Sequence, residues 1–206
     1  MNWVGWLQLR RSDADLRGVG TWSGARAFEE TVEAAGAGDE GAFSALWRWL
    51  HPSLIRYLRV VARAEADDLA SDVWLSVVQG LHRFRGDEGA FRAWVFTIAR
   101  HRVIDAARRR SRRVVDNISL VDSDAPPAPD AALEADARWE LEACLDVIRS
   151  LPPGQADVVA LRVIGGLSVP DTAAVVGKSD GAVRVLAHRG LRQLAEQLEP
   201  DGSVRS

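Results

Sequence analysis

The 206-residue sequence contains very little cysteine and no long apolar run. Cys144 is its only cysteine, which excludes an intramolecular disulfide and a zinc site built from several thiolates. No apolar stretch approaches the ~18 residues that a membrane span needs, and residues 1–11 place their charges after their apolar residues, unlike a secretory signal. We therefore expect a cytoplasmic protein without membrane insertion, whose core is drawn from the 47% of apolar residues.

Residues that support metal binding or covalent catalysis are also sparse. The four histidines lie far apart without ligand spacing, so we expect no metal and no other cofactor. The sequence shows no nucleophile paired with a base, no phosphate-binding glycine loop, and no clustered carboxylates apart from those near Asp68 and Asp72. An enzyme is therefore not expected.

The net charge of −3 averages over two segments of opposite sign. Residues 100–113 carry seven arginines and one acid, whereas residues 114–136 carry six acids and no base. The acidic segment also contains three prolines and no sustained periodicity, which is typical of a flexible linker. We therefore expect one module at 26–113 and a second at 136–198. A linker at 114–135 joins them, and a tail follows at 199–206.

Apolar residues recur at helical spacing in both modules, and no segment alternates with period two. In 38–62 we expect Pro52 to end one helix and begin the next, because a first turn does not need its missing N–H. Further helices are expected over 64–84, 139–151 and 154–167. The predicted fold class is all-α, with two helical domains joined by a flexible acidic linker and a helix-turn-helix in the C-terminal one.

The segment 91–113 joins an apolar half to a basic half. On a helical wheel, one side collects Phe91, Trp94, Val95 and Ile98, which we expect in the core. Farther along that side, Arg102 and Asp105 are spaced to form an ion pair at the rim of the core. A second stripe, which could face a ligand, holds Thr97, His101, Ile104 and Arg108.

The density of arginine in 100–113 has two interpretations. A solvated basic helix end, favoured by the negative C-terminal dipole, would account for one or two arginines. Seven in this segment create a positive field of the kind that polyanions need. We therefore favour contact with nucleic acid or phosphate.

A helix-turn-helix pattern lies in 167–198. Ser168 and Ser179 are each placed to cap a helix, and Gly177 can adopt the left-handed conformation of a tight turn. A small residue, the turn glycine and an apolar anchor follow at spacings of four and six, which allow a close helix approach and a sharp turn. These framework residues are Ala173, Gly177 and Val183.

The second helix of this pattern carries a basic face. Arg184, His188 and Arg192 recur every four residues opposite the apolar side, flanked by Val185 and Arg189. Arginine can donate to both the O6 and N7 acceptors of guanine, and other side chains can hold phosphates. The alternative is an ordinary helical hairpin with a solvated basic face. The turn spacing and the basic face together favour DNA binding.

Together these segments resemble a bacterial extracytoplasmic-function (ECF) sigma factor, a small specificity subunit of RNA polymerase. The stretch GDEGAFSALWRWLHPSLIRYL resembles the start of the family's first conserved region, and ADDLASDVWLSVVQGLHRFRG resembles its polymerase-docking helix. FRAWVFTIARHRVIDAARRRSRR resembles the segment that melts and reads the promoter −10 element. The stretch from Leu151 to Leu194 is similar to the family's −35-binding domain.

The resemblance implies three groups of contact residues. Those expected at the −10 element are Thr97, Arg100, His101, Arg108, Arg109 and Arg110. Those expected at the −35 element are Ser179, Arg184, Val185, His188, Arg189 and Arg192. Those expected at the coiled coil of the largest polymerase subunit are Asp68, Leu69, Asp72 and Val73.

The resemblance also implies core RNA polymerase, promoter DNA and an anti-sigma protein as partners, and a location at the nucleoid. A regulator that binds DNA without polymerase is the alternative, but it has no need of the 91–113 segment. Residues 1–25, with three tryptophans, have no counterpart in the family pattern. We expect a disordered extension or a misassigned start there, in preference to a regulatory or partner-binding tail.

Overall fold

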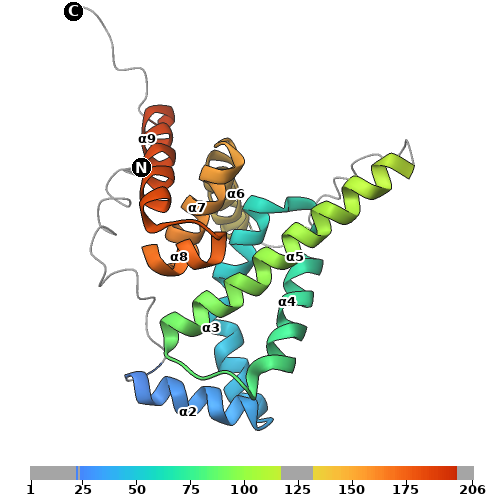
Figure 1. Cartoon of the computed structure of the whole chain (residues 1–206), viewed down its shortest axis with the longest axis vertical. Coiled ribbons are helices and arrows are strands. Elements are labelled where there is room, and N and C mark those ends of the chain that lie inside the picture. Colours follow the sequence, from blue (N-terminus) through green and yellow to red (C-terminus); the bar gives the residue numbers. More distant parts are fainter. Residues whose placement is uncertain (1–21, 23, 117–131, 199–206) are drawn as a thin grey trace, which may run out of the picture.

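The computed structural model describes residues 22, 24–116 and 132–198, and over these it is helical without a strand (Figure 1). The N-terminal domain contains α2 (Ala25–Gly36), α3 (Glu40–Val61), the 3₁₀ helix η1 (Arg63–Glu65), α4 (Ala66–Leu81) and α5 (Glu88–Asp116). The C-terminal domain contains α6 (Ala132–Arg149), α7 (Pro153–Val163), α8 (Val169–Val176) and α9 (Asp180–Leu198). The predicted all-α fold class is confirmed.

Helix α3 continues through Pro52, so the expectation of two helices in 38–62 is wrong. A proline inside a helix removes one backbone hydrogen bond and costs about 3 kcal/mol. Tertiary packing offsets this cost, because every fourth residue from Leu46 to Leu58 is fully buried. Asp39 begins the helix by accepting the N–H of Ala42 at 2.7 Å.

Helix α5 is anchored at one end and projects at the other. Its first turn is capped by Asp87, which accepts the N–H of Ala90 at 2.8 Å. Phe91, Val95, Phe96 and Ala99 are fully buried, and Ala106 is the last buried residue among the described side chains of the helix. At 1.5 Å per residue the helix is about 43 Å long. Its basic end extends beyond the body of the molecule (Figure 1).

Trp22 packs on the N-terminal domain although it falls in the segment expected to be a disordered extension. Its indole Nε1 donates to Thr31 Oγ1 at 2.8 Å, and its ring meets Phe28 and Trp49 edge to face, each at 5.0 Å between centroids. The domain therefore begins before residue 26. Residues 1–21 and 23 of the expected extension lie outside the described part of the chain.

Helix extends into the expected linker from both sides. Helix α5 ends at Asp116 and α6 begins at Ala132, so helical backbone occupies the first and last positions of 114–135. Residues 117–131, in the middle of the expected linker, lie outside the described part of the chain, as does the expected tail at 199–206.

The C-terminal domain contains the expected helix-turn-helix. The hydroxyl of Ser168 accepts the N–H of Asp171 at 3.1 Å and begins α8, and Ser179 accepts the N–H of Ala182 at 3.3 Å and begins α9. Between them Gly177 has φ +66° and ψ +42°, the left-handed conformation expected for the turn. The two helix caps at Ser168 and Ser179 and the left-handed turn at Gly177 thus have the geometry expected from the sequence.

The two domains lie against each other. Helices α6 and α7 contact α3, and α8 contacts α5 (Figure 1). The basic end of α5 projects away from this contact. Within the described residues, no helix is long and apolar enough to cross a membrane.

Candidate nucleic-acid interface

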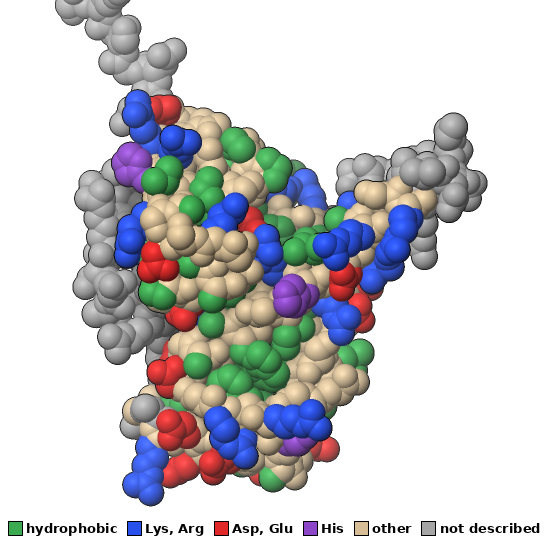
Figure 2. All heavy atoms as spheres, in the orientation of Figure 1, with side chains coloured by type: hydrophobic (Ala, Val, Ile, Leu, Met, Phe, Trp, Pro, Cys, Tyr) green, Lys and Arg blue, Asp and Glu red, His purple; other side chains and the backbone are tan. Residues whose placement is uncertain are grey.

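The basic end of α5 forms the first candidate surface, and Figure 2 shows Lys and Arg side chains gathered along it. Four of the six residues expected at the −10 element are exposed there, namely His101, Arg108, Arg109 and Arg110. Thr97 is half-buried, and its hydroxyl donates to its own helix at the carbonyl of Ala93, 2.8 Å away. The sixth residue, Arg100, is only 24% exposed and faces the C-terminal domain.

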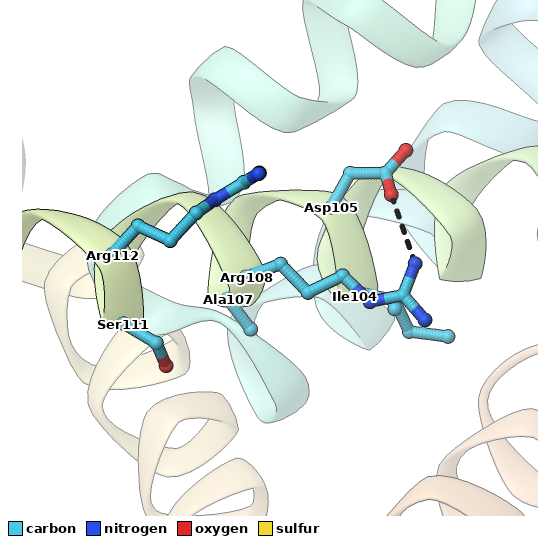
Figure 3. Close-up of a pocket in the computed structure, with 6 residues that line it drawn as sticks. All are labelled: Ile104, Asp105, Ala107, Arg108, Ser111 and Arg112. Atoms are coloured by element: carbon cyan, nitrogen blue, oxygen red, sulfur yellow. Dashed lines mark ion pairs between the residues drawn. The ribbon is translucent and has the colours of Figure 1, made fainter.

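A shallow, open groove lies at this end of α5, and Figure 3 shows six side chains that line it. Its lining combines apolar and polar side chains, namely Ile104, Asp105, Ala107, Arg108, Ser111 and Arg112. The guanidinium of Arg108 lies 3.7 Å from the carboxylate of Asp105, and both are exposed enough for solvent to weaken the pair. Of these six residues, only Arg108 was among the contacts expected at the −10 element, although Ile104 lies on the stripe that could face a ligand. Ala107 and Ser111 continue the stripe from Ile104, so helical spacing could have identified them.

Three polar contacts of α5 differ from the expected pattern or add to it. Arg102 donates to Ser76 Oγ on α4 at 2.8 Å, and Asp105 pairs with Arg108. The expected ion pair between Arg102 and Asp105 is therefore wrong, because α4 offers Arg102 a closer acceptor. Arg110 lies 2.7 Å from Glu65 of η1, which ties the basic end of α5 back to the domain.

Helix α9 forms the second candidate surface. The five expected reading residues, Arg184, Val185, His188, Arg189 and Arg192, are exposed, whereas Val183 and Leu194 are buried on the opposite side. Arg184 lies 3.8 Å from Asp180, and Arg192 lies 2.8 Å from Glu196. Both pairs are exposed and within one helix, so each stabilises the helix by only about 0.3–0.5 kcal/mol. Both arginines can exchange these partners for a ligand at little cost.

The close packing of α9 on α7 fixes the direction of this face. A Cβ at Gly190 would lie 2.7 Å from Val159 Cγ2 and 3.3 Å from Leu151 Cδ1. Glycine at this position therefore lets the two helices approach more closely than a side chain would allow. Ser179, the sixth residue expected at the −35 element, uses its hydroxyl to cap the helix.

Helix α4 separates the expected polymerase contacts into exposed and buried residues. Asp68 and Asp72 are exposed, but Leu69 and Val73 are 3% and 0% exposed and support the core. In the folded domain the two apolar residues have no surface for a partner, so this part of the expectation needs correction. The exposed apolar residues of the same helix are Leu75 and Val78, at 62% and 53%. Sequence reasoning missed them, although Asp68, Asp72 and Leu75 share helical spacing.

A histidine beneath the surface of α3 is held in its neutral form. Trp74 Nε1 donates to His51 Nδ1 at 3.2 Å, and the ring of Trp47 stacks on the imidazole at 4.4 Å. Burial lowers the pKa of His51, with nearby Asp67 opposing and Arg59 reinforcing the shift. The hydrogen bond requires an unprotonated Nδ1, which agrees with this direction. Elsewhere in the described ranges, no three His, Cys, Asp or Glu side chains gather as metal ligands would.

Both candidate surfaces lie in segments that match known protein families. The family Sigma-70 region 2 matches residues 43–113, which include α4 and the basic part of α5. The family Sigma-70, region 4 matches residues 141–194, which include the helix-turn-helix.

Two similar curated proteins are named ECF RNA polymerase sigma factors. The ECF RNA polymerase sigma factor BldN of Streptomyces coelicolor is 37% identical over 177 residues, which cover 84% of this chain and 66% of that protein. The chain thus spans just under two thirds of the length of BldN. The ECF RNA polymerase sigma factor SigD of Mycobacterium bovis is 35% identical over 185 residues, with 85% of each chain covered.

A solved structure shares the fold. The structure of CnrH in complex with the cytosolic domain of CnrY is 25% identical and has a TM-score of 0.58. The match covers 84% of this chain and 97% of CnrH. The likeness therefore extends over both helical domains.

Proposed function

The chain belongs to the ECF RNA polymerase sigma factors, alternative sigma subunits that direct transcription initiation, and we propose how its surfaces divide that task. Helix α4 binds core polymerase, α9 holds duplex DNA at the −35 element, and α5 captures the −10 strand as it opens. The family is non-enzymatic, and the chain's own part is binding without covalent chemistry.

One observation carries the proposal for the −35 element. Arg184, His188 and Arg192 line one exposed face of the second helix of a helix-turn-helix whose turn is left-handed at Gly177. In such motifs the second helix enters the major groove, where arginine donors can bridge the two acceptors of guanine. The weak intrahelical pairs of Arg184 and Arg192 leave these donors available to bases or phosphates.

The proposal for the −10 element is supported by the shape of α5. The helix is continuous from its buried aromatic residues to its arginines, so the core holds His101 and the groove beyond it in a fixed orientation. Unpaired bases can stack on planar groups such as imidazole and guanidinium while arginines follow the backbone. The groove from Ile104 to Arg112 offers apolar surface for a base beside cationic groups for phosphate.

The proposal for core polymerase is supported by the exposed face of α4. Asp68, Asp72 and Leu75 lie on one side of this helix, and Val78 adds further exposed apolar surface. Apolar side chains surrounded by acids fit a protein partner with basic residues at the rim of its contact surface. The resemblance to the family implies that this partner is the coiled coil of the largest polymerase subunit.

An anti-sigma protein is a further proposed partner. The family resemblance implies it, and CnrH, the solved relative, is in complex with the cytosolic domain of CnrY. The chain would act at the nucleoid in the cytoplasm, because promoter DNA and polymerase are found there.

Run-off transcription tests the proposed function. Transcripts whose 5′ ends appear on overproduction of the chain identify its promoters, and purified core polymerase is then assayed on those promoters with and without the chain. We expect promoter-specific transcripts only when both proteins are present. A chain that binds these promoters alone but supports no transcription with core polymerase would be a polymerase-independent regulator instead.

A variant of α4 tests the docking surface separately. Leu75→Ser removes the most exposed apolar side chain of this helix and should weaken binding to core polymerase. Trp139→Ser, which removes an exposed apolar side chain from α6, is the control and should leave binding unchanged. Equal affinities for both variants would remove Leu75 from the docking surface.

A further inference from the structure

The C-terminal domain holds Arg100, one of the arginines expected at the −10 element. Asp157 on α7 accepts two hydrogen bonds from the N-terminal domain, one from Arg100 Nε and one from the Tyr57 hydroxyl, each at 3.0 Å. The carboxylate of Asp157 is 20% exposed, and Arg100 is 24% exposed. The attraction within a charged pair this far removed from water is screened less than in an ordinary surface pair, and loss of one partner would leave the other charge poorly solvated.

Three more polar contacts cross between the domains. Arg92 Nη1 donates to the carbonyl of Gly165 at 3.3 Å. Arg59 lies 3.2 Å from Glu142, and Arg63 lies 3.5 Å from Asp146. In each of the three ion pairs that join the domains among the described residues, the base belongs to the N-terminal domain and the acid to the C-terminal domain. The two faces are therefore electrostatically complementary.

Two of the N-terminal residues are buried deeply enough to depend on this contact. Tyr57 is 1% exposed, and burial together with the nearby Asp157 raises its pKa well above the usual value. Arg92 is 7% exposed, with its guanidinium 4.5 Å from the centre of the Trp49 ring, and burial lowers its pKa despite the opposing effect of Glu88. A buried hydroxyl or guanidinium that loses its acceptor must find water or another ligand.

The packing around Asp157 is incomplete. A half-open cavity of about 310 Å³ lies between the domains beside this residue, lined by apolar side chains such as Val60, Val103 and Leu151. Well-packed interiors leave few voids of this size, and each void forfeits contact energy. Arg100 and Asp157 both line this cavity, so the contact between them lies at an open part of the domain interface.

We propose that Asp157 acts as an intramolecular substitute for a DNA phosphate at Arg100, so that the free chain rests in a closed form with part of its −10 surface occupied. This inference rests on the proposed function, because it assigns Arg100 to the −10 strand. A carboxylate and a phosphate offer the same charged acceptor oxygens to a guanidinium. The closed form also packs α8, the first helix of the helix-turn-helix, against α5.

The closed form makes binding of the −10 strand dependent on separation of the domains. In the free chain the strand must displace Asp157, so its apparent affinity is the intrinsic affinity multiplied by the fraction of molecules that are open. The proposal requires that core polymerase separates the domains when it binds the chain, so that Asp157 no longer competes in that complex.

Two variants weaken the proposed contact in different ways. Tyr57→Phe removes one hydrogen bond without changing the charge, and Asp157→Asn removes the charge with little change of shape. For the free chain we expect single-stranded −10 DNA to bind about fivefold more tightly to Tyr57→Phe and about tenfold more tightly to Asp157→Asn. Asp146→Asn is the matched control, because it removes an acid from the same interface at a more exposed pair, and its effect should stay below about twofold.

The measurements are fluorescence anisotropy with a labelled −10 oligonucleotide and small-angle X-ray scattering of the full chain. We expect both variants to show a larger radius of gyration than the unmodified chain, and all three to bind the oligonucleotide equally once core polymerase is present. Unchanged affinity and size in Tyr57→Phe and Asp157→Asn would overturn the inference. An equal gain with and without core polymerase would also overturn it, because that result indicates only a general electrostatic effect. Failure of every form to bind the oligonucleotide even with core polymerase would instead refute the proposed role of α5.

Discussion

The close approach of α9 to α7 predicts that Gly190→Ala destabilises the C-terminal domain. In a helix interior alanine is favoured over glycine by about 1 kcal/mol, so a site with free space would become more stable. At Gly190 the new methyl would lie 2.7 Å from Val159 Cγ2, a separation that side chains must move to relieve. Forcing an extra methyl into a packed site costs about 1–3 kcal/mol. The two effects leave a net destabilisation of up to about 2 kcal/mol.

Urea unfolding of the full chain, followed by circular dichroism, measures this change. Gly181→Ala is the control on the same helix, because nothing lies within 4 Å of its added Cβ. We expect Gly181→Ala to be as stable as the unmodified chain or more stable by up to about 1 kcal/mol. A Gly190→Ala chain that matches or exceeds Gly181→Ala in stability would refute the steric argument.

A second substitution tests whether Val159 is the residue that resists the methyl. Val159→Ala removes that side chain and costs stability by itself, because Val159 is 1% exposed. Combined with Gly190→Ala, it should cost less than the sum of the two single changes, since each relieves the other. Additivity within about 0.5 kcal/mol would show that the two sites are not coupled.

Three further predictions concern the two proposed DNA surfaces and His51 on α3. Arg184→Ala should weaken binding to −35 duplex by about 1–3 kcal/mol, measured by anisotropy, while Arg26→Ala, which breaks a similar exposed pair on α2, should have no effect. Replacing Arg108, Arg109 and Arg110 with neutral residues should lower the steepness of log affinity against log salt concentration for the −10 strand by up to about two units. An unaltered slope would show that these arginines do not contact the strand. Stability should fall as the pH drops below 6.5, because the folded pKa of His51 is lowered and protonation removes the acceptor of Trp74; the pH dependence should be smaller in His51→Asn.

Helical periodicity was sufficient to predict most elements, since each helix buries one stripe and exposes the other. Periodicity and proline disagree at Pro52. The preference of proline for the first turn of a helix predicts a break there, whereas the apolar stripe continues on both sides of it. The buried residues Leu50 and Leu54 flank the proline on one face. Burial of that face outweighs the loss of one hydrogen bond.

The exposed parts of the candidate site were also predictable, because reading residues must lie opposite the core. The assignment of Leu69 and Val73 to a partner surface conflicted with their own apolar stripe, and the structure follows the stripe. Contacts between residues far apart in the chain could not be predicted. Nothing in the local pattern indicates that Arg100 meets Asp157, because this pairing depends on how the two domains pack.

The part of α5 beyond its last described buried residue, Ala106, is long enough to amplify a small tilt of the helix. About 15 Å of helix follows Ala106, so a tilt of roughly 10° about this residue would displace the tip by about 2.6 Å. A displacement of that size is comparable to the length of a hydrogen bond. Under the proposed function, substitutions that tilt α5 near Ala106 should therefore alter promoter recognition without touching a nucleotide.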